Sequence, residues 1–139
     1  FPSEMTARLA EHADLFLYDL KHVDPSWHRD GTGATNERIL KNFRLLLEAV
    51  GPERLTPRIA LIPDFNVDPV TVDAFASFLC AAGYAGPIQL LPYHAWARGK
   101  YERLGRLGAF RVLDGLDDVQ IRAIGERFQK CGLTPVYQI

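Results

Sequence analysis

The chain has 139 residues, of which 47% are hydrophobic and 24% charged, and its formal net charge at pH 7 is -1. This length suits one core, so we expect residues 1–139 to form a single domain. The balanced charge predicts no basic stripe for nucleic acid, and no apolar run reaches the roughly 18 residues that a membrane-spanning helix needs. The first residues, Phe1-Pro2-Ser3-Glu4, lack the pattern of a signal peptide, so the cytoplasm is the expected location.

Helical and extended patterns alternate along the chain. Helices are expected where apolar residues recur three and four positions apart, and strands where short apolar runs lie between proline, glycine and polar residues. Thr35 or Asn36 and the pair Asp68-Pro69 are typical helix starts, and Gly51-Pro52 is a typical helix end. The expected elements, in chain order, are a helix over 3–10, a strand over 15–21, a loop over 22–35, a helix over 37–50, a strand over 57–63, a helix from 69 to about 82, a strand over 88–92, a loop or short helix around 96–101, a helix over about 116–130 and a short strand over 135–139.

This alternation predicts an α/β fold with a parallel sheet built from right-handed βαβ units. Such units make up (β/α) barrels and open doubly wound sheets. Three strong strands are too few to close a barrel. The sequence therefore predicts a partial barrel that is part of a longer protein.

The strand over 15–21 is apolar until it ends in charged residues. Because side chains alternate between the faces of a strand, Leu17, Asp19 and Lys21 share one face and Tyr18 lies on the other. Parallel strands carry functional residues at their carboxyl ends. We therefore expect a site at the end of this strand.

Four ionisable residues are predicted to share the site-facing side of their strands, with Ile88 and Leu90 on that same side. Two cations, one anion and one imidazole suit a zwitterionic or carboxylate-bearing ligand, since buried charges are costly unless they are paired. The alternative is structural, with an ion pair between strands and an ordinary loop histidine. The four residues are Asp19, Lys21, Arg58 and His94.

The two cysteines, Cys80 and Cys131, show neither CxxC nor CxxxCxxC spacing. Their apolar, helix-like surroundings predict two small core residues. Neither a disulfide framework nor a metal cluster is expected from this chain.

Four short motifs, in order, resemble the glycyl-radical-enzyme activating enzymes. The first is the strand from Asp14 to Lys21, and the second is His28 with Thr32-Gly33 and residues 36–42. The third and fourth are residues 58–63 with Asn66, and residues 90–94 followed by 99–101. Together they cover nearly the whole chain.

The resemblance implies a radical S-adenosylmethionine (SAM) enzyme on a partial (β/α)6 barrel. In that family a [4Fe-4S] cluster held by a CxxxCxxC motif cleaves SAM reductively, and the resulting radical takes hydrogen from a glycine of a partner glycyl radical enzyme. It also implies a flavodoxin- or ferredoxin-type electron donor. The chain resembles the C-terminal part of such a barrel, so the cluster ligands are expected upstream.

The residues of this chain that match SAM-binding positions of the family are expected to contact SAM. Asp19 and Lys21 match an Asp-Leu-Lys motif at the methionyl part of SAM, where Lys21 suits the carboxylate and Asp19 is a possible ligand of a monovalent cation. Arg58 matches an arginine at the SAM site, and His94 matches a histidine beside the adenosine. A glycine common in the family is replaced by Asp64.

Three other matching residues, His28, Thr32 and Asn36, are expected to serve the loop and the helix cap. Two alternatives to the activating enzyme stay open at this point. One is aldolase-type chemistry with a Schiff base at Lys21. The other is a non-catalytic half-barrel that docks on a partner through its sheet edge.

Overall fold

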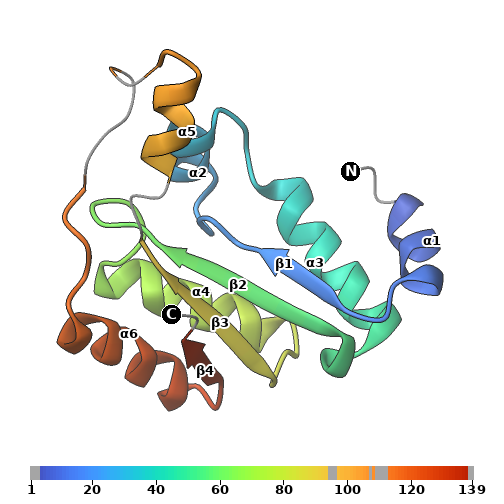
Figure 1. Cartoon of the computed structure of the whole chain (residues 1–139). Coiled ribbons are helices and arrows are strands. Elements are labelled where there is room, and N and C mark those ends of the chain that lie inside the picture. Colours follow the sequence, from blue (N-terminus) through green and yellow to red (C-terminus); the bar gives the residue numbers. More distant parts are fainter. Residues whose placement is uncertain (1–3, 94–96, 107, 109–112, 138–139) are drawn as a thin grey trace.

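The computed structural model describes residues 4–93, 97–106, 108 and 113–137. Within them, four parallel strands form one sheet in chain order (Figure 1). The strands are β1 (Phe16–Asp19), β2 (Leu55–Leu61), β3 (Pro87–Pro92) and β4 (Thr134–Tyr137). The predicted α/β class with a parallel sheet is therefore confirmed.

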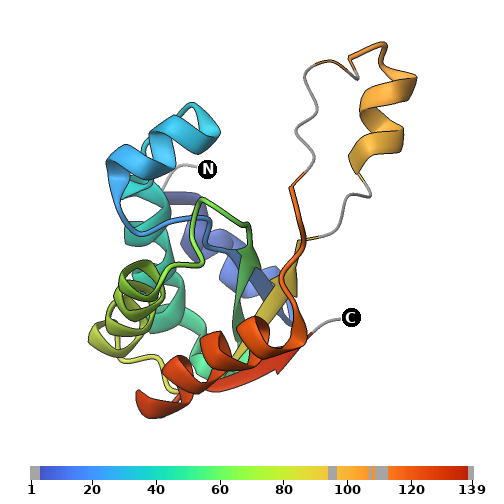
Figure 2. The ribbon, with the colours of Figure 1, turned by 90° about the vertical axis from the view of Figure 1, so that its left-hand side faces the viewer.

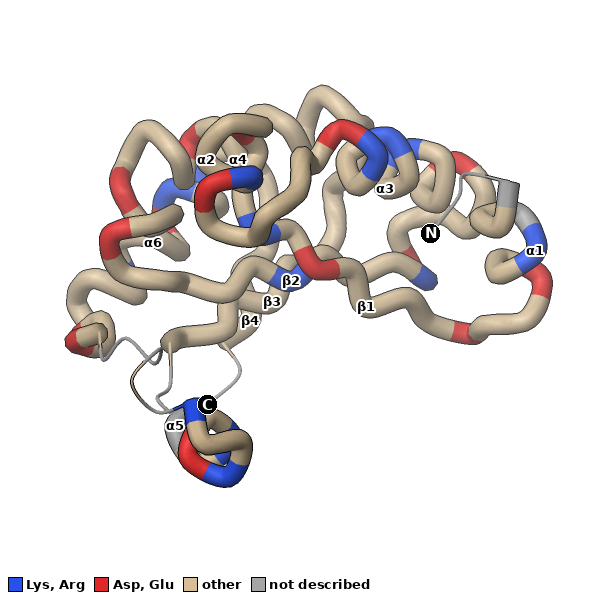
Figure 3. Tube along the Cα trace, turned by 90° about the horizontal axis from the view of Figure 1, so that it is seen from above, with Lys and Arg blue, Asp and Glu red and all other residues tan. Residues whose placement is uncertain are grey.

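The helices connect the strands. They are α1 (Glu4–His12), α2 (Pro25–Thr32), α3 (Glu37–Val50), the 3-10 turn η1 (Pro52–Arg54), α4 (Pro69–Ala81), α5 (Ala97–Arg103) and α6 (Asp118–Lys130). Seen from above, α2, α3, α4 and α6 lie on one side of the sheet and α5 on the other (Figure 3). Helix α5 stands away from the rest of the described chain (Figure 2). One face of the sheet is therefore covered by helices and the other is largely open.

The burial of β2 shows the two faces. Leu55, Ile59 and Leu61 are buried under the helices, whereas Arg58 and Ala60 on the opposite face are half-buried. The covered face holds most of the core, with α3 and α4 contributing residues such as Phe43, Leu46, Phe75 and Leu79. The opposite face carries the half-buried side chains of β2, among them Arg58.

The expected orientation of β3 is wrong. Ile88 and Leu90 lie on the covered face and are buried, and Leu90 is the register partner of Ile59. Gln89 is the register partner of Arg58, so Gln89 lies on the open face. A run that is apolar on both faces does not show which face is covered, because only the register with β2 decides it.

The predicted loop over 22–35 contains helix α2. The Asp24 carboxylate accepts hydrogen bonds from the backbone N–H groups of Ser26 and Trp27 at 2.8 and 3.0 Å. Pro25 occupies the first turn, and Gly33 ends the helix at φ 83°. Asp-Pro is the same start signal that correctly predicted α4 at Asp68-Pro69. Pro25 and Gly33 therefore mark the start and the end of a short helix, whereas the sequence pattern predicts a loop there.

The prediction that the cysteines are core residues is also wrong. Cys80 lies in the last turn of α4 and Cys131 directly follows α6, and both are exposed. The Cys80 thiol donates to the carbonyl oxygen of Cys131 at 3.3 Å. The pKa of Cys80 is raised, first by partial burial and then by the neighbouring Cys131. Helix ends face solvent even where the local sequence is apolar.

Across the described ranges, none of the helices is both long and apolar enough to cross a bilayer.

Candidate functional site

The candidate site lies between the carboxyl end of β1 and the middle of β2, where Asp19 accepts two charged hydrogen bonds. Asp19 and Arg58 are register partners on the two strands. The Arg58 Nε donates to Asp19 Oδ1 at 2.7 Å, and the Lys21 Nζ donates to Asp19 Oδ2 at 3.1 Å. Three of the four predicted site residues therefore come together, and the fourth, His94, lies outside the described residues.

The charge of this cluster favours an anionic ligand. Burial raises the pKa of Asp19, but the hydrogen bonds and positive charges of Arg58 and Lys21 outweigh it and leave the pKa below its ordinary value. Asp19 is therefore ionised at neutral pH. One carboxylate beside two cations leaves one positive charge in excess, and the side chains are 30 to 39% exposed, so a ligand can reach them.

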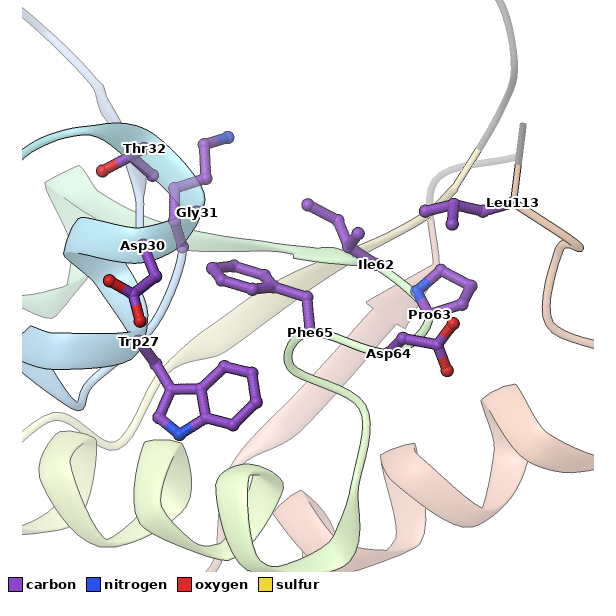
Figure 4. A pocket seen from close by; sticks show the side chains of 10 residues that line it. Trp27, Asp30, Gly31, Thr32, Ile62, Pro63, Asp64, Phe65 and Leu113 are labelled. Carbon is purple, nitrogen blue, oxygen red and sulfur yellow. The ribbon is translucent and has the colours of Figure 1, made fainter. Parts of the chain in front are cut away.

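Two cavities border the cluster. Lys21 lines a cavity of about 510 Å³ together with Trp27 and Phe65. In Figure 4 the Phe65 ring lies near the middle, with Trp27 and Asp30 of α2 at one side and Asp64 beside the end of β2 at the other. Asp19 and Arg58 line a second cavity, of about 350 Å³. The cluster is therefore reachable from two sides.

The loop after β1 is held by the residues expected to serve it. His28 is buried, and its Nδ1 donates to the carbonyl oxygen of Ala34 at 2.6 Å. The Thr32 hydroxyl donates to the backbone oxygen of His28 at 2.7 Å. These contacts confirm a structural role for both side chains.

Asn36 differs from its prediction. It occupies the cap position of α3, but its side chain makes no capping hydrogen bond. Its Nδ2 instead donates to the carbonyl oxygen of His22 at 2.7 Å, which fixes the chain just beyond Lys21. The prediction that the Asn36 side chain caps α3 is therefore wrong, because this side chain binds the His22 carbonyl oxygen instead.

Gln89 is a site residue that sequence reasoning missed. It lies beside Arg58 on the open face, and its Oε1 is buried without a hydrogen-bond partner in the described part of the chain. A buried acceptor without a partner is uncommon and fits a site that takes a hydrogen-bond donor. The signal in the sequence was a polar residue between two buried apolar ones, Ile88 and Leu90.

The residues of this chain do not fit an iron–sulfur cluster. Within the described residues, no three His, Cys, Asp or Glu side chains gather to hold a metal ion. Cys80 lies at the end of α4, which runs back from the carboxyl end of β2 to the amino end of β3. It is therefore at the opposite end of the sheet from Asp19, and no step is assigned to a cluster in this chain.

Comparison with known proteins places the chain in a family, although no family model matches it. It is 36% identical over 135 residues to the isethionate sulfite-lyase activating enzyme of Desulfovibrio desulfuricans, which covers 92% of the chain and 43% of the relative. It is 31% identical over 132 residues to the indoleacetate decarboxylase activating enzyme of Tractidigestivibacter scatoligenes, covering 95% and 41%. The chain belongs to the glycyl-radical-enzyme activating enzymes.

The fold agrees with that family. A crystal structure of a domain of a pyruvate-formate lyase-activating enzyme from Bacteroides vulgatus matches with a TM-score of 0.78 and 24% identity, over 99% of this chain and 75% of that one. The chain spans less than half the length of each of these two relatives. The activity of a whole activating enzyme is therefore a proposal for this chain.

Proposed function

We propose that this chain is the SAM-binding, C-terminal part of the barrel of a glycyl-radical-enzyme activating enzyme. The observation that carries the proposal is the cluster of Asp19, Lys21 and Arg58 beside the carboxyl end of β1, with one positive charge in excess. The amino-acid end of SAM bears a carboxylate, which suits this excess charge. Family membership supports the proposed reaction class, and the cluster supports the proposed location of the SAM site.

Each site residue has a proposed task. Lys21 binds the SAM carboxylate, and Asp19 holds Lys21 and Arg58 in place while offering an oxygen to a monovalent cation or to the amino group of the ligand. Arg58 orients the same end of the ligand, and the family resemblance assigns His94 a contact with the adenosine. When bound and reductively cleaved, SAM would supply the group that abstracts hydrogen from a backbone glycine of the partner enzyme. The orphaned Gln89 Oε1 on the same face supports the fit of a ligand with a donor group.

The other components are proposed to lie outside this chain. The [4Fe-4S] cluster and its cysteines belong upstream, since the cysteines present do not fit them. A flavodoxin- or ferredoxin-type protein would deliver the electron, and a glycyl radical enzyme would be the protein substrate. The names of the two relatives show that such activators serve different enzymes.

The geometry disfavours a Schiff base at Lys21. The Lys21 Nζ donates a hydrogen bond to the Asp19 carboxylate at 3.1 Å, so this nitrogen is engaged in an ion pair. A Schiff base needs a lysine nitrogen that is free to attack a carbonyl carbon. The ion pair therefore suits ligand binding better than nucleophilic attack.

The test uses the protein that carries this chain, purified anaerobically and supplied with SAM and dithionite. We expect release of 5′-deoxyadenosine, measured by chromatography, and loss of this product in Lys21→Ala. Borohydride trapping with carbonyl compounds should leave the mass of the protein unchanged. A trapped adduct at Lys21, or no SAM cleavage by a cluster-loaded protein, would overturn the proposal.

A further inference from the structure

Asn66 lies in the segment between β2 and α4 and is fully buried, with 0% exposure. Its Oδ1 accepts from the backbone N–H of Ile62 at 2.8 Å. Its Nδ2 donates to the carbonyl oxygens of Lys21 and Ala60 at 2.9 and 2.8 Å. All donors and the acceptor oxygen of this amide are therefore used on the backbone of two strand ends.

The hydrogen bonds of Asn66 lie where the pairing between β1 and β2 ends. The pairing of β1 with β2 runs to Asp19 and Arg58, and Leu20 N–H donates to the carbonyl oxygen of Arg58 at 2.9 Å. Just beyond, the Asn66 side chain joins the Lys21 carbonyl to the Ala60 carbonyl. A side chain thus continues the connection between the two strands where Lys21 leaves the sheet.

A second buried asparagine provides a comparison. Asn36 donates to the carbonyl oxygen of His22, the residue after Lys21, and ties it to the start of α3. Asn66 instead ties Lys21 to the strand that carries Arg58. The two asparagines therefore hold consecutive carbonyls to different parts of the fold.

We propose that Asn66 is a positioning residue that sets the Lys21 ammonium relative to the Arg58 guanidinium, so that both cations reach one ligand carboxylate. Small displacements of a charged group weaken such two-point binding strongly, and supporting hydrogen bonds prevent them. This inference rests on the proposed SAM site. It adds that the site depends on an amide that never touches the ligand.

The test compares two ligands in the protein that carries this chain. SAM has the carboxylate, whereas 5′-methylthioadenosine keeps the adenosine and sulfur but lacks it. In Asn66→Ala we expect the dissociation constant for SAM to rise about tenfold and that for 5′-methylthioadenosine to change less than about twofold. Asn36→Ala is the matched control, and it should affect SAM binding less than Asn66→Ala does.

A double-mutant cycle with Lys21→Ala isolates the mechanism. If Asn66 acts through Lys21, Asn66→Ala should add little further loss of SAM affinity in the Lys21→Ala background. Equal losses for both ligands, or fully additive losses, would show that Asn66 serves only general stability. Failure of the wild-type protein to bind SAM would instead refute the proposed function.

Asn66→Ala leaves three backbone groups without this partner, so its folding is checked by circular dichroism and thermal unfolding. Asn66→Ser, which keeps a short hydrogen-bonding group, is the second variant. It should show the same selective loss for SAM, to a smaller extent. If neither variant folds, Asn66 is a structural residue and the proposal is overturned.

Discussion

Asp19 and Arg58 face each other across neighbouring strands, with Arg58 Nε 2.7 Å from Asp19 Oδ1. Register partners point to the same face, so this pair fixes a charged row on the open side of the sheet. Lys21, two residues on, adds the second cation to the same carboxylate. Asp19 thus holds both cations of the proposed ligand site together.

The first prediction concerns Lys21. Lys21→Ala should weaken SAM binding by about 1.5 to 3 kcal/mol, the range for a lost hydrogen bond to a charged group. Lys21→Arg should restore only part of the affinity, because a guanidinium differs from an ammonium in reach and shape. Isothermal titration calorimetry measures both.

The matched control is Lys41→Ala, which removes an exposed lysine of α3. It should leave SAM affinity unchanged. Wild-type affinity in Lys21→Ala would remove Lys21 from the site.

The second prediction concerns acid stability. Because the folded-state pKa of Asp19 is lowered, its pairing stabilises the fold above the pKa of the unfolded chain, about 4, and this contribution is lost as the pH falls through the folded-state pKa. Asp19→Asn should therefore lower the free energy of unfolding at pH 7. The difference should be below about 1 kcal/mol, because the three side chains are partly exposed and screened by solvent.

Urea unfolding of the two proteins between pH 7 and pH 3 measures this effect. The difference between wild type and Asp19→Asn should shrink as the pH falls below about 4. A difference that is constant over this range would contradict a stabilising role for the Asp19 ion pairs.

The order and type of most elements could be predicted from the sequence, because apolar spacing and the Asp68-Pro69 and Gly51-Pro52 signals are local. The meeting of Asp19 with Arg58 followed from the alternation of side chains, which places both residues on the same face of parallel strands. The face of Ile88 and Leu90 could not be predicted in this way, since it depends on register across the sheet. The buried roles of Asn36 and Asn66 were equally hidden, because they bind carbonyls far away in the sequence.

The third prediction concerns Asp64, which stands where the glycyl-radical-enzyme activating enzymes commonly have a glycine. Asp64 adopts a left-handed backbone with φ 61°, a conformation that glycine adopts without strain. The backbone requirement is therefore retained although the residue has changed. Asp64→Val should lower the free energy of unfolding by about 1 to 2 kcal/mol, because a β-branched side chain is poorly accommodated there.

Asp64→Gly is the matched variant at the same exposed position. Its free energy of unfolding should lie within about 0.5 kcal/mol of the wild-type value. Relief of strain in the folded state offsets the greater conformational freedom that glycine gives the unfolded chain. Chemical denaturation of the three proteins compares them. Equal stability of Asp64→Val and Asp64→Gly would mean that the left-handed backbone does not constrain this position.

The last prediction concerns Tyr84, which lies buried beneath the sheet. Its hydroxyl shares its one proton between the carbonyl oxygens of Leu55 and Pro87, which lie at 3.1 and 2.6 Å, and so joins the starts of β2 and β3. Tyr84→Phe should lower the free energy of unfolding by about 1 to 3 kcal/mol, because two buried acceptors lose their donor. Urea unfolding at pH 7 measures this loss.

The same tyrosine should limit stability in alkali. Burial raises the pKa of Tyr84 to about 12 from 10.0, so the folded state favours the neutral phenol. This contribution is present below pH 10 and is lost as the pH rises from the unfolded pKa through the folded one. Tyr18 has its pKa raised in the same way, to about 12, and donates to the carbonyl oxygen of Ile39. Between about pH 10 and pH 12 the wild type should therefore lose stability more steeply than Tyr84→Phe, and Tyr18→Phe should show the same partial relief. Parallel pH profiles for the wild type and Tyr84→Phe would mean that ionisation of Tyr84 does not oppose folding.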